Sequence, residues 1–93
     1  MFFVYVLQSL KDRKYYIGYT GDLKVRIKKH NKGHVKSTKH RRPLKLVYYE
    51  TLRTRKNAYR REQEIKRMKG GIQFKQLIES SNGHRKAGSR LAG

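Results

Sequence analysis

Two residues that could handle an anion and a proton lie one helical turn apart in the basic segment 23–30. Arg26 and His30 are four residues apart, on the same side of a predicted helix as Leu23 and Ile27. An arginine there could stabilise negative charge, and a histidine could accept or donate a proton. Two exposed side chains on a basic helix, or a histidine that only fills the core, remain alternatives, and spacing alone does not decide between them.

A third candidate is a carboxylate on an apolar stripe. The chain has six Asp and Glu residues, and only Glu62 falls on a helical stripe between apolar residues, Ala58 and Ile65. A carboxylate in that position is costly unless it meets a cation or a metal ion. A salt bridge to a neighbouring arginine and a metal site therefore both remain open.

Tyrosines on two predicted strands complete a set that suits phosphodiester hydrolysis. Tyr5 and Tyr16 are expected on inner faces of the sheet, although most strand tyrosines only pack. The reaction needs a base for water, a cation at the phosphate and help for the leaving oxygen, which one divalent ion on one carboxylate can supply. The chain has no closely spaced pair of acids, which argues against a two-metal nuclease, and no glycine-rich phosphate loop or cysteine nucleophile.

The charge points to a polyanionic partner. The formal net charge is +19, and residues 23–49 contain ten Lys or Arg, three His and no acid. A field of this kind favours nucleic acid. An anionic membrane is the competing partner, but it typically uses one amphipathic helix or a lipidation motif, so we expect no membrane binding. The residues we expect to contact nucleic acid are Lys29, Lys36, Lys39, Arg41 and Arg42. A solvated flexible loop is the alternative for residues 34–42.

Length and composition limit the organisation of the chain. Its 93 residues allow one domain, which we place at residues 1–82, and we expect residues 83–93 to form a disordered basic tail. There are no cysteines, which fits a reducing cytoplasm. No apolar run approaches the ~20 residues of a membrane span, and the N-terminus lacks the pattern of a signal peptide. We therefore expect a cytoplasmic protein.

Periodicity and turn residues predict an α+β fold with element order ββαβαα. We expect a small three-stranded antiparallel sheet flanked by helices, with the first strand central because its apolar run would be covered on both faces. Asp22 and Thr54 are placed to cap the first two helices. The predicted strands are residues 2–7, 15–20 and 44–51, and the predicted helices are residues 23–30, 55–68 and 72–80.

Alternation and helical spacing assign side chains to faces. In the first strand Phe3, Tyr5 and Leu7 share one face, opposite Val4 and Val6. In the third strand, the same rule places Leu46 and Tyr48 on one face and Val47 and Tyr49 on the other. The last helix is expected to pack through Ile72, Leu77, Ile78 and Phe74.

Several of these segments together resemble the GIY-YIG nucleases. Phe3-Val4-Tyr5 stands where the first triplet of that family lies, and Tyr16-Ile17-Gly18 matches the second letter for letter. The helix with Arg26 and His30 follows, and A-Y-R-R-E-Q-E-I-K resembles the glutamate helix of the family. The chain looks closest to the small stand-alone bacterial branch of the UPF0213 type. The first triplet departs from the family pattern at Phe3 and Val4, which shape the strand, while its tyrosine is kept.

The resemblance implies a one-metal mechanism and a role for each matched residue. Tyr5 would act as, or relay to, the base that activates water, and His30 would hydrogen-bond Tyr5 or take its proton. Tyr16 would orient the water or a phosphate oxygen, and Arg26 would stabilise charge on the phosphate. Glu62 would bind Mg²⁺ or Mn²⁺ at the leaving oxygen. The segment F-K-Q-L-I-E-S-S-N resembles the last helix of the family, whose asparagine, placed at the nucleic acid, would be Asn82.

The leading hypothesis is a metal-dependent DNA endonuclease that is structure-specific or weakly sequence-specific and works in DNA repair or recombination. The residues provide no helix-turn-helix or zinc finger for reading bases, so a protein partner or a dimer could supply targeting. A non-catalytic nucleic-acid-binding module of the same fold is the first alternative, and a component of a ribonucleoprotein is the second. An inward-facing glutamate distinguishes the enzyme from both.

Overall fold

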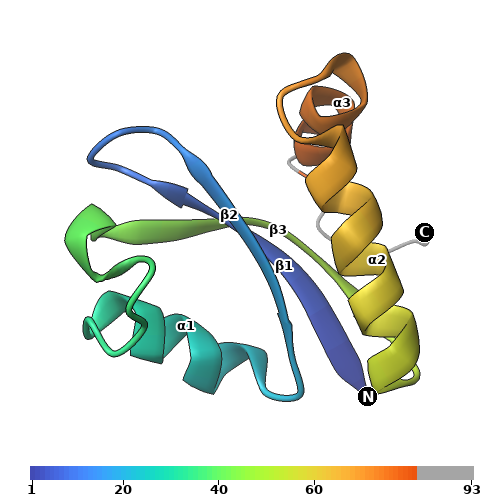
Figure 1. The fold of residues 1–93 in the computed structure, drawn as a ribbon, viewed down its shortest axis with the longest axis horizontal. Helices are drawn as coiled ribbons and strands as arrows, with labels where there is room; N and C mark the ends of the chain where they lie inside the picture. The colour runs from blue at the N-terminus through green and yellow to red at the C-terminus, as the bar shows by residue number, and fades with distance from the viewer. Residues whose placement is uncertain (82–93) are drawn as a thin grey trace.

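The computed structural model describes residues 1–81, which form a three-stranded antiparallel sheet with helices on both faces (Figure 1). The strands are β1 (Phe2–Ser9), β2 (Tyr15–Thr20) and β3 (Leu44–Leu52), in the order β2-β1-β3. The predicted α+β class, the ββαβαα order and the central position of the first strand are confirmed. The predicted tail at 83–93 lies outside the described residues, as does Asn82.

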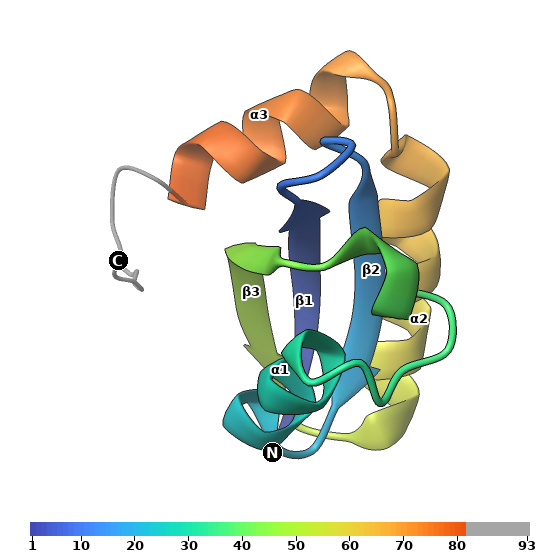
Figure 2. The same ribbon diagram turned by 90° about the vertical axis from the view of Figure 1, so that its left-hand side faces the viewer.

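The helices divide between the two faces of the sheet. Helix α1 (Leu23–Asn31) lies on one face, and α2 (Arg55–Met68) and α3 (Ile72–Ser81) lie on the other (Figure 2). A short 3₁₀ helix η1 (Lys39–Arg41) follows α1. Asp22 and Thr54 accept hydrogen bonds from backbone N–H groups in the first turns of α1 and α2, so both predicted caps are confirmed. Within residues 1–81, no helix has the length and apolar character that a membrane span requires.

Strict alternation along β1 gives the protein two small cores. Val4 and Val6 are fully buried against Ala58 and Ile65 of α2, while Tyr5 and Leu7 point to the α1 side. The faces predicted for β1 are therefore confirmed. The arrangement places Tyr5 in the layer that also contains α1.

A β-bulge in β3 contradicts the predicted alternation of that strand. Val6 pairs with Tyr48 but Leu7 pairs with Leu46, so Val47 is an extra residue. Leu46 therefore packs on the α1 side, while Tyr48 packs on the α2 side, and our expectation that they share a face was wrong. Past the bulge, Tyr49 pairs directly with Tyr5.

Helix α3 packs differently at its start from what we expected. Ile72 is 76% exposed, whereas Phe74 and Ile78 are buried and Leu77 packs beside them. Phe74 and Ile78 are one turn apart, and Ile72 precedes Phe74 by two residues, which places it on the opposite side of the helix. The prediction that Ile72 joins the core was therefore wrong.

Candidate active site

The hydroxyl of Tyr5 lies between two side chains of α1. Its oxygen is 3.1 Å from Nε2 of His30, and Nε of Arg26 donates a hydrogen bond to it over 3.3 Å. Tyr5 comes from the centre of the central strand, and Arg26 and His30 lie one turn apart on the helix face that packs on it. Tyr5 and His30 are buried and Arg26 is half-buried. The structure thus brings three of the five predicted catalytic residues into direct contact.

Thr38 is a fourth member of this group, and our sequence analysis missed it. Its hydroxyl oxygen is 2.7 Å from Nδ1 of His30, and its side chain is 1% exposed. The same hydroxyl donates to the carbonyl oxygen of Val35 over 3.5 Å. We therefore assign the proton of His30 to Nδ1, so Nε2 is free to accept the hydroxyl proton of Tyr5. A threonine in a polar loop carries no sequence pattern that reveals this contact.

The surroundings keep His30 neutral. Burial and, to a smaller extent, the nearby positive charge of Arg26 lower the pKa of His30 to about 4. A neutral imidazole can accept a proton from Tyr5, whereas an imidazolium cannot. Near neutral pH, the contact is therefore a hydrogen bond in which the Tyr5 hydroxyl donates to Nε2 of His30.

Gly18 explains the close packing of Tyr5 against β2. The two residues are cross-strand partners, and a Cβ atom on Gly18 would lie 2.5 Å from the hydroxyl oxygen of Tyr5 and 2.7 Å from Cζ. No side chain fits there unless the Tyr5 ring moves. We had matched this glycine to the second triplet without a physical reason for it, and the ring of Tyr5 provides one.

Tyr16 lies on the same side of the sheet but makes different contacts. Its ring is half-buried next to the core of Tyr5 and Leu7. Nζ of Lys69, at the end of α2, is 5.8 Å from the centre of the ring. The structure therefore places Tyr16 near the others, without a hydrogen bond to Tyr5, Arg26 or His30 within residues 1–81.

Glu62 reaches the sheet from the opposite layer. It is 8% exposed on the sheet-facing stripe of α2, where its carboxylate accepts a hydrogen bond from Gln63 and lies 3.6 Å from Nζ of Lys66. The salt bridge we considered is thus made with a lysine. Within residues 1–81, no hydrogen bond or ion pair joins Glu62 to Tyr5, Arg26 or His30. The same part of the chain contains no cluster of three or more His, Cys, Asp or Glu side chains suited to a metal ion.

Two ring contacts show how α2 is aligned with β2. Tyr59 packs on Tyr19 with ring centres 6.3 Å apart, and Lys69 lies over Tyr16. Because Glu62 lies between Tyr59 and Lys69 on α2, it lies beside the middle of β2, the strand that carries Gly18. This strand forms an edge of the sheet.

Comparison with known proteins shows the family of this chain. The family model described as the GIY-YIG catalytic domain matches residues 1–73. The chain belongs to the GIY-YIG family. UPF0213 proteins of Staphylococcus aureus strains Mu3 and N315 are 46% identical to it over 65 residues, which cover 69% of this chain and 78% of each relative.

A solved structure supports the same assignment. The solution NMR structure of a UPF0213 protein from Bacillus halodurans has a TM-score of 0.56 and 36% identity, and the match covers 89% of this chain and 88% of that one. The predicted resemblance to UPF0213-type GIY-YIG proteins is therefore confirmed. Membership implies a nuclease-type domain, and GIY-YIG nucleases generally use divalent metal ions.

The basic segment of this GIY-YIG protein is held in place by the turn between β1 and β2. Ser9 is fully buried and donates to the carbonyl oxygen of Arg41 over 2.6 Å, while Asp12 pairs with the Arg41 guanidinium at 3.3 Å. Nε of Arg42 donates to the carbonyl oxygen of Lys39. The five described residues predicted to contact nucleic acid are all exposed: Lys29, Lys36, Lys39, Arg41 and Arg42.

A second polar cluster lies on the α2 side of the GIY-YIG domain. Arg61 pairs with Glu50 at 2.7 Å and with Glu64 at 3.0 Å, and Tyr48 donates to Glu50. Burial, together with the hydrogen bond to Glu50 and its charge, raises the pKa of Tyr48. These contacts tie β3 to α2.

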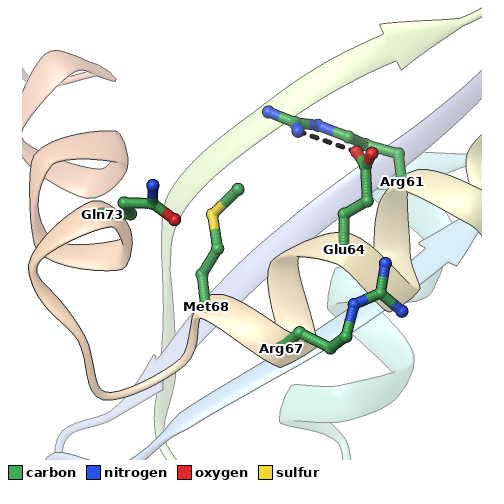
Figure 3. A pocket seen from close by; sticks show the side chains of 5 residues that line it. All are labelled: Arg61, Glu64, Arg67, Met68 and Gln73. Carbon is green, nitrogen blue, oxygen red and sulfur yellow. Dashed lines mark hydrogen bonds and ion pairs between the residues drawn. The ribbon is translucent and has the colours of Figure 1, made fainter.

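A cavity of about 280 Å³ lies next to this cluster (Figure 3). Its lining residues are Arg61, Glu64, Arg67, Met68 and Gln73. The Arg61 guanidinium is already neutralised by two carboxylates, and the cavity lies on the α2 and α3 side of the sheet. We therefore place the candidate active site at Tyr5 and not at this cavity.

Proposed function

We propose that this protein is a metal-dependent DNA endonuclease that hydrolyses phosphodiester bonds by a one-metal mechanism. Its substrate would be DNA recognised by structure, or with weak sequence preference, in repair or recombination. The absence of cysteine fits action in the cytoplasm. The proposed catalytic residues are Tyr5, Tyr16, Arg26, His30 and Glu62.

The single observation that carries the proposal is the position of the Tyr5 hydroxyl between Arg26 and His30. Neutral His30 takes the proton of Tyr5, and Tyr5 in turn activates a water molecule. Arg26 has no carboxylate partner among residues 1–81, so its outer nitrogens are available to a phosphate oxygen. A half-buried arginine without a counter-ion is unusual for a purely structural residue.

The donor at Glu62 suits the divalent ion that GIY-YIG nucleases generally use. Mg²⁺ keeps several water ligands and needs only one or two carboxylates besides the substrate phosphate, so a single glutamate is sufficient. Glu62 would hold Mg²⁺ or Mn²⁺, which when bound supplies positive charge for the leaving oxygen. The neighbouring ammonium of Lys66 would turn away toward solvent, because it is an exposed side chain.

We further propose that the two groups of residues act on one phosphodiester across the edge of β2. Arg26, Tyr5 and Tyr16 approach from the α1 side, and Glu62 approaches beside the middle of the same strand from the α2 side. Support comes from the alignment of α2 with β2 and from Gly18, which adds no side chain at the point between them.

A cleavage assay on duplex, nicked, flapped, branched and single-stranded DNA with Mg²⁺ or Mn²⁺ tests the proposal. Arg26→Ala and Glu62→Gln should each lower the rate by at least about 100-fold, while both variants still bind DNA. Exposed Glu79 provides the matched control, because Glu79→Gln should cleave like wild type. Equal cleavage by all three variants would refute the proposed site.

One observation favours a second function, a nucleic-acid-binding module without catalysis. Glu62 is paired with Lys66 and does not contact Tyr5. If wild type binds DNA and cleaves none of these substrates with either ion, the protein is a nucleic-acid-binding module of the same fold. Binding without cleavage is therefore the result that favours this second function.

A further inference from the structure

An exposed aromatic ring lies next to Tyr5 on the α1 side of the sheet. Tyr49 of β3 pairs directly with Tyr5 of β1, so the two side chains point to the same face. Tyr49 is 52% exposed, although it belongs to the sheet. Its ring lies 6.3 Å from that of Phe3, at an angle of 55°. Tyr49 is therefore a supported ring with one side open to solvent.

The surroundings of Tyr49 suit a nucleic acid. Side chains directly opposite in an antiparallel pair have Cβ atoms about 4.5–5.5 Å apart, so Tyr49 is an immediate neighbour of Tyr5, whose hydroxyl contacts Arg26. Residues 23–49, which include α1 and the start of β3, contain no acidic side chain. A phosphate bound at Arg26 would thus have its neighbouring base within reach of the Tyr49 ring.

We propose that Tyr49 is a stacking platform for an unpaired base next to the phosphate held by Arg26. The location of that phosphate rests on the proposed function. In a duplex, both faces of a base are already covered by its neighbours, so a ring can stack only on a base that is unpaired or at an end. The preferred ligand class is therefore single-stranded nucleic acid, or a branched structure with an unpaired nucleotide at the cleavage position.

A second tyrosine offers a matched control for this argument. Tyr59 is also 52% exposed, and its ring also lies 6.3 Å from another aromatic ring, that of Tyr19. It belongs to α2 on the opposite face of the sheet, away from Arg26. Single exposed aromatic side chains are common and need no function, so a difference between the two tyrosines is what the proposal requires.

Binding of a fluorescent oligothymidylate, measured by anisotropy in EDTA, tests the proposal. Tyr49→Ala should weaken binding by about tenfold, a typical loss for one stacked base, while Tyr49→Phe and Tyr59→Ala bind like wild type. Binding of a blunt duplex should be unchanged in all variants. Equal losses for Tyr49→Ala and Tyr59→Ala, or an equal loss for duplex and single strand, would overturn it.

An abasic probe isolates the base itself. Removing one base from a short single strand that spans the site should weaken binding by wild type and by Tyr49→Phe, with no further loss in Tyr49→Ala. The binding is measured in EDTA, which prevents metal-dependent cleavage. If the protein shows this binding pattern but cleaves no substrate with Mg²⁺ or Mn²⁺, the stacking site is supported and the endonuclease proposal is refuted. If cleavage depends on Arg26 but Tyr49→Ala binds single strands like wild type, the endonuclease proposal is supported and the stacking site is refuted.

Discussion

The hydroxyl oxygen of Tyr5 lies 3.1 Å from Nε2 of His30, and both side chains are buried. Their rings meet edge to face with centres 5.8 Å apart, which holds the two atoms in line. Because His30 is neutral and its other nitrogen is bound to Thr38, the contact has one direction, from the tyrosine to the histidine.

Acid should destabilise the protein through His30. Its pKa is about 4 when folded and about 6.5 when unfolded, so between these values the unfolded state binds more protons. The free energy of unfolding should therefore fall as the pH drops from 6.5 to 4, by up to about 3 kcal/mol. Urea unfolding at a series of pH values should show this slope in wild type and in His34→Gln, whose histidine is exposed, but not in His30→Gln. An unchanged slope in His30→Gln would contradict the assignment.

Gly18→Ala should destabilise the fold, because its Cβ atom would lie 2.5 Å from the hydroxyl of Tyr5. We expect a loss of about 1–3 kcal/mol in the free energy of unfolding, the usual cost of overpacking. Gly21→Ala is the control, since its Cβ atom would meet Phe2 at an ordinary 3.6 Å. Two variants of equal stability in chemical denaturation would show that the Tyr5 ring adapts freely.

Thr38 should act as a positioning residue for His30. Thr38→Val removes the acceptor for the Nδ1 proton, so the cleavage rate should fall about 10- to 100-fold, while DNA binding is kept and Thr38→Ser restores activity. The ¹⁵N chemical shifts of the His30 ring should report a changed tautomer in Thr38→Val and no change in Ser37→Ala. Wild-type shifts in Thr38→Val would refute this role.

Binding of duplex DNA should depend steeply on salt through the segment after α1. Each phosphate contact adds about 0.9 to the slope of log affinity against log salt concentration. The double variant Lys36→Gln/Lys39→Gln should reduce the slope by up to about 1.8. Lys56→Gln/Lys75→Gln, which removes two exposed lysines from α2 and α3, should leave it unchanged. A similar reduction in both would mean that DNA has no preferred face.

Strand alternation and helical spacing were sufficient to predict much of the fold from the sequence. Alternation in β1 separated Tyr5 from Val4, and the spacing in α1 placed Arg26 and His30 toward the sheet, because each rule depends only on neighbours in the chain. The contact between His30 and Thr38 depends on the path by which the loop after α1 returns to that helix. Sequence periodicity does not predict this path. The bulge at Val47 and the exposure of Ile72 likewise follow from tertiary packing. Glu62 was found by its stripe, and its partner Lys66 lies at i+4 on the same helix, a spacing that the sequence shows although we had considered only an arginine.

The extra residue in β3 decides which of two adjacent tyrosines belongs to which layer. Because Val47 is the extra residue, Tyr48 lies on the α2 side, where it donates to Glu50, and Tyr49 lies on the α1 side, opposite Tyr5. If Val47 instead paired with Val6 in a strand without the bulge, the two rings would exchange faces. The phenol that anchors α2 and the phenol beside Tyr5 would then both be misplaced by a change that touches neither. The pairing register of β3, and not only the identity of its residues, therefore fixes which layer each phenol joins.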